Sequence, residues 1–437
     1  MRFIRLVFTG LLMLLLSQAS VFAQSESATV APGTVITMQN WKQYKQFMPD
    51  GMANLFAGTY YWKMPPDIRI QIGAPNHFDP PTKFIQDTEK YGGSAKIVQL
   101  PNGAHSVTGY VAGLPFPTPA DPQKGYKILV NMWYRYTPYL MCGKHGVAIE
   151  YDRFHNASPL TFWEVDRKFS FISDIGMPIT DPSYPGVDRI QYNQVVSPEQ
   201  ARYTAQIKVY YVDPSKDQDS FAFIPSLRRV LRLSSAARCS PHLGSDAVED
   251  DSREGFNGGI VLWDGTFLHD QDIISLTKSD PHQFGNVYSP QDYYQSGLTF
   301  PTPTVGTWEV RPTYVIDAHR LPPFQKGYCY GKEVMWIDKD SYGILWKDQY
   351  DPAMKFWKTS MALHLGTPVP GEGFQREGTQ FIQLIIDQQN AHYGVVATSD
   401  PQGRWFRANS DCKDYEGTDF TNVKRFATPA GLWQVMR

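Results

Sequence analysis

The chain has 437 residues, with 41 Lys or Arg against 43 Asp or Glu, so its formal net charge is only −2 at pH 7. A near-neutral chain lacks the basic surface that nucleic-acid binding requires, and no polybasic segment is present that would bind an anionic membrane surface. Aromatic residues make up 14% of the chain, which fits either an ordinary β-rich core or an apolar cavity with polar-tipped walls.

The first residues have the pattern of a cleavable export signal. Arg2 and Arg5 provide positive charge, residues 6–16 are mostly apolar, and small residues lead up to Ala23. An uncleaved membrane anchor is the weaker alternative, because the apolar run is shorter than the about 20 residues that a membrane-spanning helix needs. The expected division is a signal peptide at 1–23, a disordered leader at 24–34 and a single folded domain at 35–437.

Three short helical patterns follow the leader. Asn40 is placed to cap a helix that carries Trp41, Tyr44 and Phe47 on one face. Residues 52–56 form a second short pattern. Residues 82–91 form a third, which two glycines terminate.

From residue 96 onward, strand patterns dominate. The apolar residues Tyr203, Ala205, Ile207, Val209 and Tyr211 alternate with mostly polar ones, which is the period of a half-buried strand. Further strands are expected at 97–100, 126–136, 228–233, 259–263, 308–318, 327–337, 381–387, 392–398 and 405–408. Acidic segments at 246–254 and 264–272 are expected to interrupt the sheet. Strands without long helices between them predict an antiparallel sheet, so the expected fold is mainly β, of the β-rich α+β class.

The cysteine count is even, which in an exported chain predicts two disulfides. The four residues are Cys142, Cys239, Cys329 and Cys412. Three pairings are possible, and we favour Cys142–Cys239 with Cys329–Cys412. The alternative is a metal site, because His145 and His242 follow two of the cysteines at the same spacing. An oxidising compartment disfavours that site, so we expect no metal and no cofactor.

An acidic run precedes residue 256, and it has two interpretations. Its members are Asp246, Glu249, Asp250, Asp251 and Glu254. Clustered carboxylates can bind calcium, but the spacing does not match an EF-hand loop. The alternative is a solvated turn whose acids pair with Arg228, Arg229 and Arg232.

Catalytic signatures are absent from the sequence. There is no hydrolase elbow, no phosphate-binding glycine loop and no zinc-protease motif. His319 stands two residues after Asp317, which could orient its ring in a strand, but an ordinary surface or core histidine is the simpler interpretation. We therefore expect no catalytic residues and no enzyme.

Three motifs in order resemble a known family. They span residues 221–232, residues 245–258 and residues 335–358, where Met335-Trp336-Ile337-Asp338 opens the last one. Together they resemble the exported bacterial proteins of the domain of unknown function 1329 family, over nearly all of the mature chain. The motifs are expected to hold the fold rather than to contact a ligand.

The resemblance implies a fold and a role. The family is similar to periplasmic lipoprotein-localisation carriers, which implies a curved antiparallel sheet, an unclosed barrel, with short helices over its mouth. It implies a periplasmic carrier or chaperone for a lipid or other hydrophobic molecule, with an inner-membrane exporter of the RND type or an outer-membrane protein as partner. An exported enzyme acting on a hydrophobic or glycan substrate and a purely structural envelope protein are the alternatives.

The cost of exposing a hydrophobic ligand to water indicates where in a carrier the ligand would lie. An acyl chain in water costs about 0.8 kcal/mol per CH₂ group, so it needs an apolar shield. Large apolar residues on the concave face of the sheet would provide one, with residues 41–56 as a lid. On this hypothesis Ile207, Val209, Val334 and Trp336 line a cavity. The alternative is that these four residues fill an ordinary core packed against helices.

Overall fold

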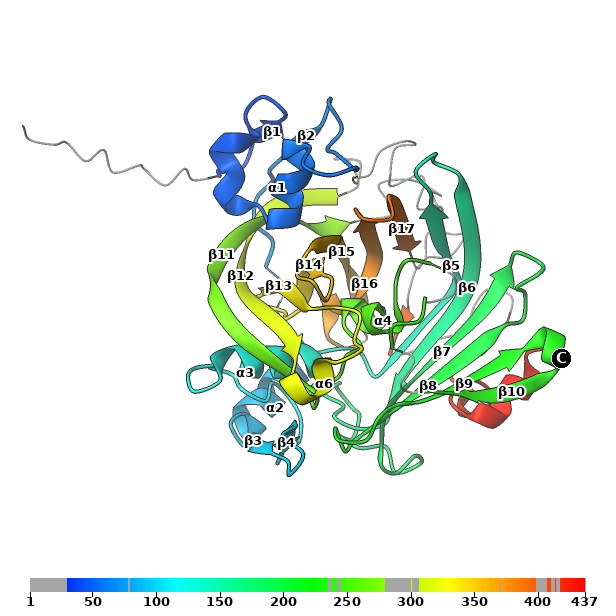
Figure 1. Ribbon diagram of the computed structural model, residues 1–437. Coiled ribbons are helices and arrows are strands. Elements are labelled where there is room, and N and C mark those ends of the chain that lie inside the picture. The colour runs from blue at the N-terminus through cyan, green and yellow to red at the C-terminus, as the bar shows by residue number, and fades with distance from the viewer. Residues whose placement is uncertain are drawn as a thin grey trace, which may run out of the picture.

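The computed structural model describes residues 30–437 except 78, 235–237, 242–244, 280–299, 301–305, 370, 398–406, 410–412, 414–416 and 437. The expected signal peptide and most of the leader therefore lie outside the described residues. Within them, one 14-stranded antiparallel sheet dominates, and its edge strands β10 and β11 do not pair with each other. Figure 1 shows this sheet curving around an interior that contains the short helix α4. The expected mainly β fold, an unclosed barrel with a few short helices, is confirmed.

The strands of the large sheet run in the order β10-β9-β8-β7-β6-β5-β17-β16-β15-β14-β13-β12-β11, with β18 paired to β5. The first group in the chain is β5 (Leu140–Tyr151), β6 (Ala157–Lys168), β7 (Val187–Ser197), β8 (Ala205–Tyr211), β9 (Asp219–Ile224) and β10 (Arg229–Leu233). The second group is β11 (Trp263–Ser279), β12 (Gly306–Arg320), β13 (Lys332–Asp338), β14 (Ile344–Tyr350), β15 (Phe356–Val369), β16 (Gly373–Asp387), β17 (His392–Ala397) and β18 (Arg407–Ala408).

Short elements surround the sheet. Two small hairpins pair β1 (Val35–Thr37) with β2 (Arg69–Gln71) and β3 (Lys96–Gln99) with β4 (His105–Thr108). The α-helices are α1 (Asp50–Ala57), α2 (Thr82–Tyr91), α3 (Lys124–Trp133), α4 (Ser252–Gly255), α6 (Pro322–Gln325) and α7 (Val423–Phe426). The 3₁₀ helices are η1 (Trp41–Phe47), η2 (Pro225–Leu227), η3 (Glu249–Asp251) and η5 (Pro429–Gln434). Among the described residues, no helix has the length and apolar character needed to cross a membrane.

Residues 126–136, expected as a strand, form most of helix α3 instead. The run is mostly apolar, but its polar residues Lys127, Asn131 and Arg135 recur every four residues, a helical spacing that the strand prediction overlooked. The helix crosses strand β11 closely, because a side chain at Gly125 would collide with the backbone at Gly265. Two further expectations were wrong: residues 259–262 form a loop, and the acidic segment 264–272 belongs to β11 rather than interrupting the sheet.

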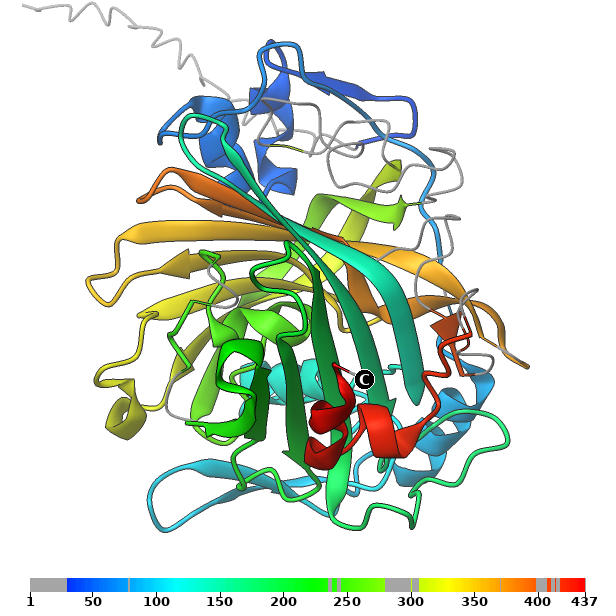
Figure 2. The ribbon, with the colours of Figure 1, turned by 90° about the vertical axis from the view of Figure 1, so that its right-hand side faces the viewer.

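Helices cover the outer face of the sheet on both halves. On one half, η1 and α1 pack against the apolar side of β13 to β17, in a core that contains Met52, Phe56, Val334 and Trp336. On the other half, the C-terminal elements α7 and η5 pack against β7, β8 and β9. Figure 2 shows this C-terminal segment, in red, lying across the green strands. Residues 41–56, which were expected to form a lid over the cavity, therefore pack on the outer face of the sheet instead.

The interior face is covered differently. A third core joins α3 to the inner sides of β11, β12 and β13. Next to it, the chain between β10 and β11 enters the curve of the sheet, where it forms η3 and α4 (Figure 1). We call residues 238–258, of which 242–244 are not described, the inner segment.

Trp336 provides a test of the outer core. Trp336 is 3% exposed, and its indole N–H donates to Gln271 Oε1 over 2.6 Å. We expect Trp336→Ala to lower the free energy of unfolding by about 3–5 kcal/mol, measured by chemical denaturation, with binding of an apolar fluorescent probe unchanged. Trp433→Ala, at a side chain that is 53% exposed, is the control and should cost far less. Weaker probe binding at unchanged stability would instead place Trp336 in a cavity wall.

Candidate functional site

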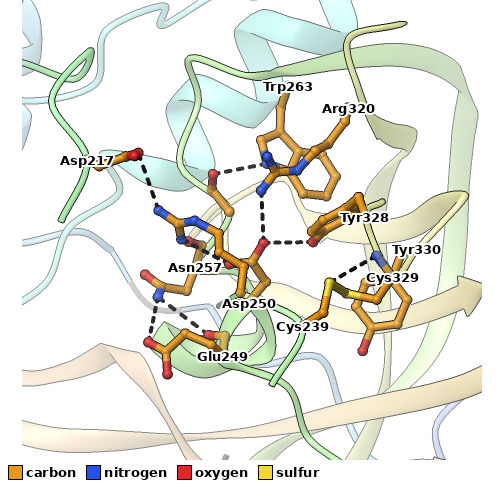
Figure 3. Close-up of polar contacts among 12 residues, drawn as sticks. Asp217, Cys239, Glu249, Asp250, Asn257, Trp263, Arg320, Tyr328, Cys329 and Tyr330 are labelled. Carbon is orange, nitrogen blue, oxygen red and sulfur yellow. Dashed lines mark hydrogen bonds and ion pairs between the residues drawn. A yellow bond between two sulfur atoms is a disulfide. The ribbon is translucent and has the colours of Figure 1, made fainter. Parts of the chain in front are cut away.

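The inner segment is fastened to the sheet by two adjacent buried acids. The first, Asp250, is 1% exposed. It accepts hydrogen bonds from the Tyr328 hydroxyl at 2.7 Å, from Arg238 Nη1 at 2.9 Å and from Arg320 Nη2 at 3.3 Å (Figure 3). Arg238 also donates to the carbonyl oxygen of Asn257 at 2.7 Å. Arg238 thus connects the two ends of the inner segment. The Asp250 carboxylate connects the segment to β12 through Arg320 and to the loop before β13 through Tyr328.

The second acid, Asp251, faces β13 and β14. Its Oδ1 accepts from Lys347 Nζ at 2.9 Å and from Gln349 Nε2 at 2.7 Å, and its Oδ2 accepts from the Tyr330 hydroxyl at 2.7 Å. Burial alone would raise the pKa of Asp251, but the ammonium groups of Lys347 and Lys358 outweigh it and hold the pKa well below its usual range. The carboxylate is therefore ionised and paired.

Glu333 lies in the same cluster, but its pKa shifts in the opposite direction to that of Asp251. Its Oε1 accepts from Lys347 at 3.0 Å and from Gln349 at 2.7 Å. Complete burial nevertheless raises the pKa of Glu333 to about 7, because it outweighs the attraction of Lys347, and the charge of Asp251 adds to the rise.

A disulfide adds a covalent link between the inner segment and the sheet. Cys239 bonds to Cys329, just before β13, and Figure 3 shows the bridge beside Tyr330. The favoured pairing of Cys142 with Cys239 and of Cys329 with Cys412 was therefore wrong. Cys142 is disulfide-bonded too, while Cys412 lies outside the described residues. Cys142 and Cys239 thus have no thiolate to offer the alternative metal site. The pairing was missed because spacing along the sequence gives no information on which distant segments become neighbours.

A cavity of about 230 Å³ lies between the inner segment and the strands β5 to β8, β16 and β17. Part of its wall is apolar. Ala148 on β5 is directly opposite Leu160 on β6 and Val396 on β17, and all three line the cavity together with Phe162 and Ile385.

The other part of the wall is polar and comes from three neighbouring strands. The register of β6, β7 and β8 places Asp166, Gln191 and Lys208 in one cross-strand row, and Glu164, Asn193 and Gln206 in the next. All six line the cavity. Asp166 pairs with Arg189, and Gln191 Nε2 donates to Glu164 at 2.8 Å. The cavity therefore has an apolar side and a hydrogen-bonding side, as an amphiphile requires.

The inner segment forms one side of the cavity and contacts the polar wall. Lys208 Nζ lies 2.7 Å from Glu249 Oε1 and 3.0 Å from Ser252 Oγ, so these contacts connect the segment to β8. Arg253, which also lines the cavity, holds its guanidinium 3.4 Å from the ring centre of Trp133. The contact restrains a charged side chain at the cavity wall.

A second cluster of ionisable groups stands where the inner segment meets β5 and β17. His392 Nδ1 lies 2.7 Å from Asp246 Oδ2, and the backbone N–H of Asp246 donates to Glu150 Oε1 at 3.4 Å. Burial raises the pKa of Glu150 to about 8, and the neighbouring Asp246 adds to the rise. Glu150 also lines the cavity.

The four residues expected to line a cavity do not line this one. Ile207 and Val209 pack under the C-terminal helices, and Val334 and Trp336 pack under η1 and α1. The physical reason is that helices cover the apolar outer face of the sheet. The cavity is therefore lined by the side chains at the alternate positions, which point to the inner face. On β8 that set is Gln206 and Lys208. The sequence signal that was missed is the repeat of polar residues at alternate positions of three consecutive strands.

The acidic run is neither a calcium loop nor a solvated turn. Asp250 and Asp251 are buried, and they pair with Arg238, Arg320 and Lys347 rather than with Arg228, Arg229 and Arg232. Arg232 instead pairs with Asp219 on the adjacent strand. The motifs at residues 245–258 and 335–358 contact each other through Asp251 and Lys347, and the inner segment in addition lines the cavity.

Comparison with known proteins identifies one family. Residues 35–428 match the family described as "Protein of unknown function (DUF1329)". Comparison with curated proteins finds no match.

Solved structures offer distant likenesses. A candidate outer membrane lipoprotein-sorting protein domain from Vibrio parahaemolyticus has 15% identity and a TM-score of 0.45, with 67% of this chain and 95% of that chain covered. A DUF1329 family protein from Desulfovibrio piger has 15% identity and a TM-score of 0.44, with 68% and 100% covered. A LolA superfamily protein from Nitrosomonas europaea has 13% identity and a TM-score of 0.37, with 63% and 89% covered. All three TM-scores are below 0.5, so these likenesses carry no weight in assigning function.

The anchorage of the inner segment can be tested at Arg238, which pairs with one buried and one exposed acid. Asp250 is 1% exposed at its side chain, whereas Asp217, 3.7 Å from Arg238 Nη2, is 61% exposed. We expect Asp250→Ala to cost about 3–5 kcal/mol of stability, because it leaves buried cations unpaired. Asp217→Ala should cost at most about 1 kcal/mol. Equal losses in denaturant titrations would show that Asp250 does not anchor the segment.

Glu333 gives stability a pH dependence whose sign can be worked out. Because burial raises the folded-state pKa of Glu333 from 4.5 to about 7, the folded protein retains a proton that the unfolded chain releases. Stability should therefore fall as pH rises between these values. Between pH 5 and pH 8, the wild type should lose roughly 3 kcal/mol more of its free energy of unfolding than Glu333→Gln does. Chemical denaturation at each pH measures this difference. The same change at Glu199, 79% exposed at its side chain, should leave the slope unaltered. An unchanged slope in the Glu333 variant would contradict the assignment.

Proposed function

The chain belongs to the DUF1329 family, and we propose that it is an exported carrier that holds an amphiphilic molecule in the cavity beneath the inner segment. The observation that carries this proposal is the cavity itself, because its wall changes from apolar at Ala148, Leu160 and Val396 to hydrogen-bonding along β6, β7 and β8. Such a site shields a hydrocarbon portion from water while satisfying a polar head group.

The cavity volume limits what this conformation can hold. An engineered cavity of about 150 Å³ holds benzene, and sites for drug-sized ligands span roughly 300–1,000 Å³. The observed 230 Å³ therefore suits one short apolar group. A larger lipid requires the cavity to widen.

Widening is easiest on one side of the inner segment. Towards β12 to β14, buried ion pairs and the Cys239–Cys329 disulfide hold the segment. Towards β8 the polar contacts run through Lys208, and towards β5 the backbone N–H of Asp246 donates to Glu150 Oε1 over 3.4 Å. We therefore expect cargo to enter by separating the inner segment from the β5–β8 half of the sheet, while the anchored side stays in place.

Several finer points follow from this proposal. The protein acts in the periplasm, and an inner-membrane exporter of the RND type or an outer-membrane protein hands over or receives the cargo. It is a carrier rather than an enzyme, since acids in the polar wall are engaged in structural contacts, such as Asp166 with Arg189 and Glu164 with Gln191. An enzyme acting on a hydrophobic or glycan substrate is the competing function, and turnover of bound cargo would distinguish it.

Filling the cavity tests the carrier function. We expect Ala148→Trp to place an indole in the apolar part of the cavity and to weaken binding of N-phenyl-1-naphthylamine at least about 10-fold, which corresponds to ~1.4 kcal/mol. Fluorescence titration of the purified mature protein measures this, and native mass spectrometry shows whether an amphiphile copurifies with the wild type.

The matched control is Ala157→Trp, on the adjacent strand β6. Ala157 is exposed and lies outside the cavity, so this variant should bind the probe as the wild type does. Equal probe binding by the wild type and both variants, or no binding by any of them, would refute a carrier function for this cavity.

A further inference from the structure

Three potential metal ligands from three separate segments converge at one end of the cavity. Glu150 comes from β5, Asp246 from the inner segment and His392 from the start of β17. Glu150 lies directly opposite Gly394 in the β5–β17 ladder. Because His392 is two residues from Gly394, Glu150 and His392 project from the same face of the sheet.

The geometry is close to that of a bound ion. The three donor atoms lie within 4.8 Å of one another, and His392 Nδ1 is 2.7 Å from Asp246 Oδ2. Metal bonds of about 2.0–2.2 Å separate the donors of a tetrahedral site by roughly 3.3–3.6 Å. Small side-chain rotations would therefore bring all three to a common centre.

The space for the Glu150 carboxylate is kept open by a glycine. A Cβ atom at position 394 would collide with Glu150 Oε2. Glu150 and Gly394 also line the cavity, as do Ser245 and Ala247 on either side of Asp246. An ion at this centre would thus have an entry path and at least one position open to water or to a ligand in the cavity.

The charge of the cluster also favours a cation. Two half-buried carboxylates stand side by side, an arrangement that is unfavourable unless a proton or cation neutralises it. The nearby ammonium of Lys358 is directed elsewhere, since it donates to the main-chain carbonyl of Asp246 and to the Tyr330 hydroxyl.

We propose that Glu150, Asp246 and His392 form a binding site for a divalent transition-metal ion, with zinc the best match to one imidazole nitrogen and two carboxylate oxygens. Calcium and magnesium fit poorly, because they require more oxygen ligands than the cluster provides. The cavity side leaves a coordination position for water or for an anionic group of a bound molecule. The site stands independently of the carrier function, because metal binding needs no cargo.

The test is calorimetric titration of zinc chloride into the untagged mature protein after treatment with a chelator. The wild type should bind one zinc ion and should not bind magnesium under the same conditions. His392→Gln and Asp246→Asn should each weaken zinc binding at least about 10-fold, the lower limit expected even for loss of a residue that only supports a ligand. Far-ultraviolet circular dichroism verifies that each variant is folded.

The chain offers a matched control in a second histidine–aspartate pair. His319 Nδ1 lies 3.3 Å from Asp317 Oδ1 on β12, and this pair belongs to no three-ligand cluster among the described residues. His319→Gln should leave zinc affinity unchanged. Substitution with Co²⁺ gives a second readout, because its visible absorption should appear in the wild type and in the His319 variant but not in His392→Gln. Absence of zinc binding by the wild type, or undiminished binding by folded His392→Gln, would overturn the proposal.

Discussion

The interior of this protein depends on two neighbouring acids, Asp250 and Asp251, that are buried and paired with Arg320 and Lys347 of the sheet, Asp250 also with Arg238 of the inner segment itself. A buried carboxylate without its partners costs several kcal/mol. The inner segment consequently cannot slide along the sheet without leaving a charge unpaired. Tyr328 and Tyr330, two residues apart, each donate to one of these acids, so a single short stretch of chain aligns both.

This anchorage makes the interior asymmetric. The side of the inner segment that faces β12 to β14 is rigidly held, and the side that faces β5 to β8 adjoins the cavity. The rows of polar side chains on β6, β7 and β8 have some of their hydrogen bonds satisfied within the protein, by Gln191 with Glu164, Asp166 with Arg189 and Lys208 with the inner segment, which lowers the cost of a polar wall beside the cavity. A segment that packed equally well on both sides would have filled the space that a ligand requires.

The residue pattern of the sequence predicted some helices and strands correctly and missed others. Residues 82–91 carry clear helix signals and form α2, and the alternation after residue 203 forms β8. Residues 126–136 were misassigned because their high apolar content was given more weight than the helical four-residue spacing of Lys127, Asn131 and Arg135. Strands β5, β6 and β7 were not predicted at all. On β6 and β7 the interior positions are polar where the cavity lies, so the hydrophobic pattern that marks a half-buried strand is weakened there.

The sequence by itself determined that the chain folds as a large antiparallel sheet, because alternation is a local property, while the resemblance to the DUF1329 family indicated residues 245–258 and 335–358 as structural motifs. Only the tertiary structure decided which face of each strand borders the cavity. Alternation yields two sets of side chains per strand, and their direction depends on which outer surface the helices cover, so Ile207 and Trp336 became core residues. The tertiary structure likewise paired Cys239 with Cys329 and brought Glu150, Asp246 and His392 together, because these contacts join segments whose separation along the chain carries no information about their distance in space.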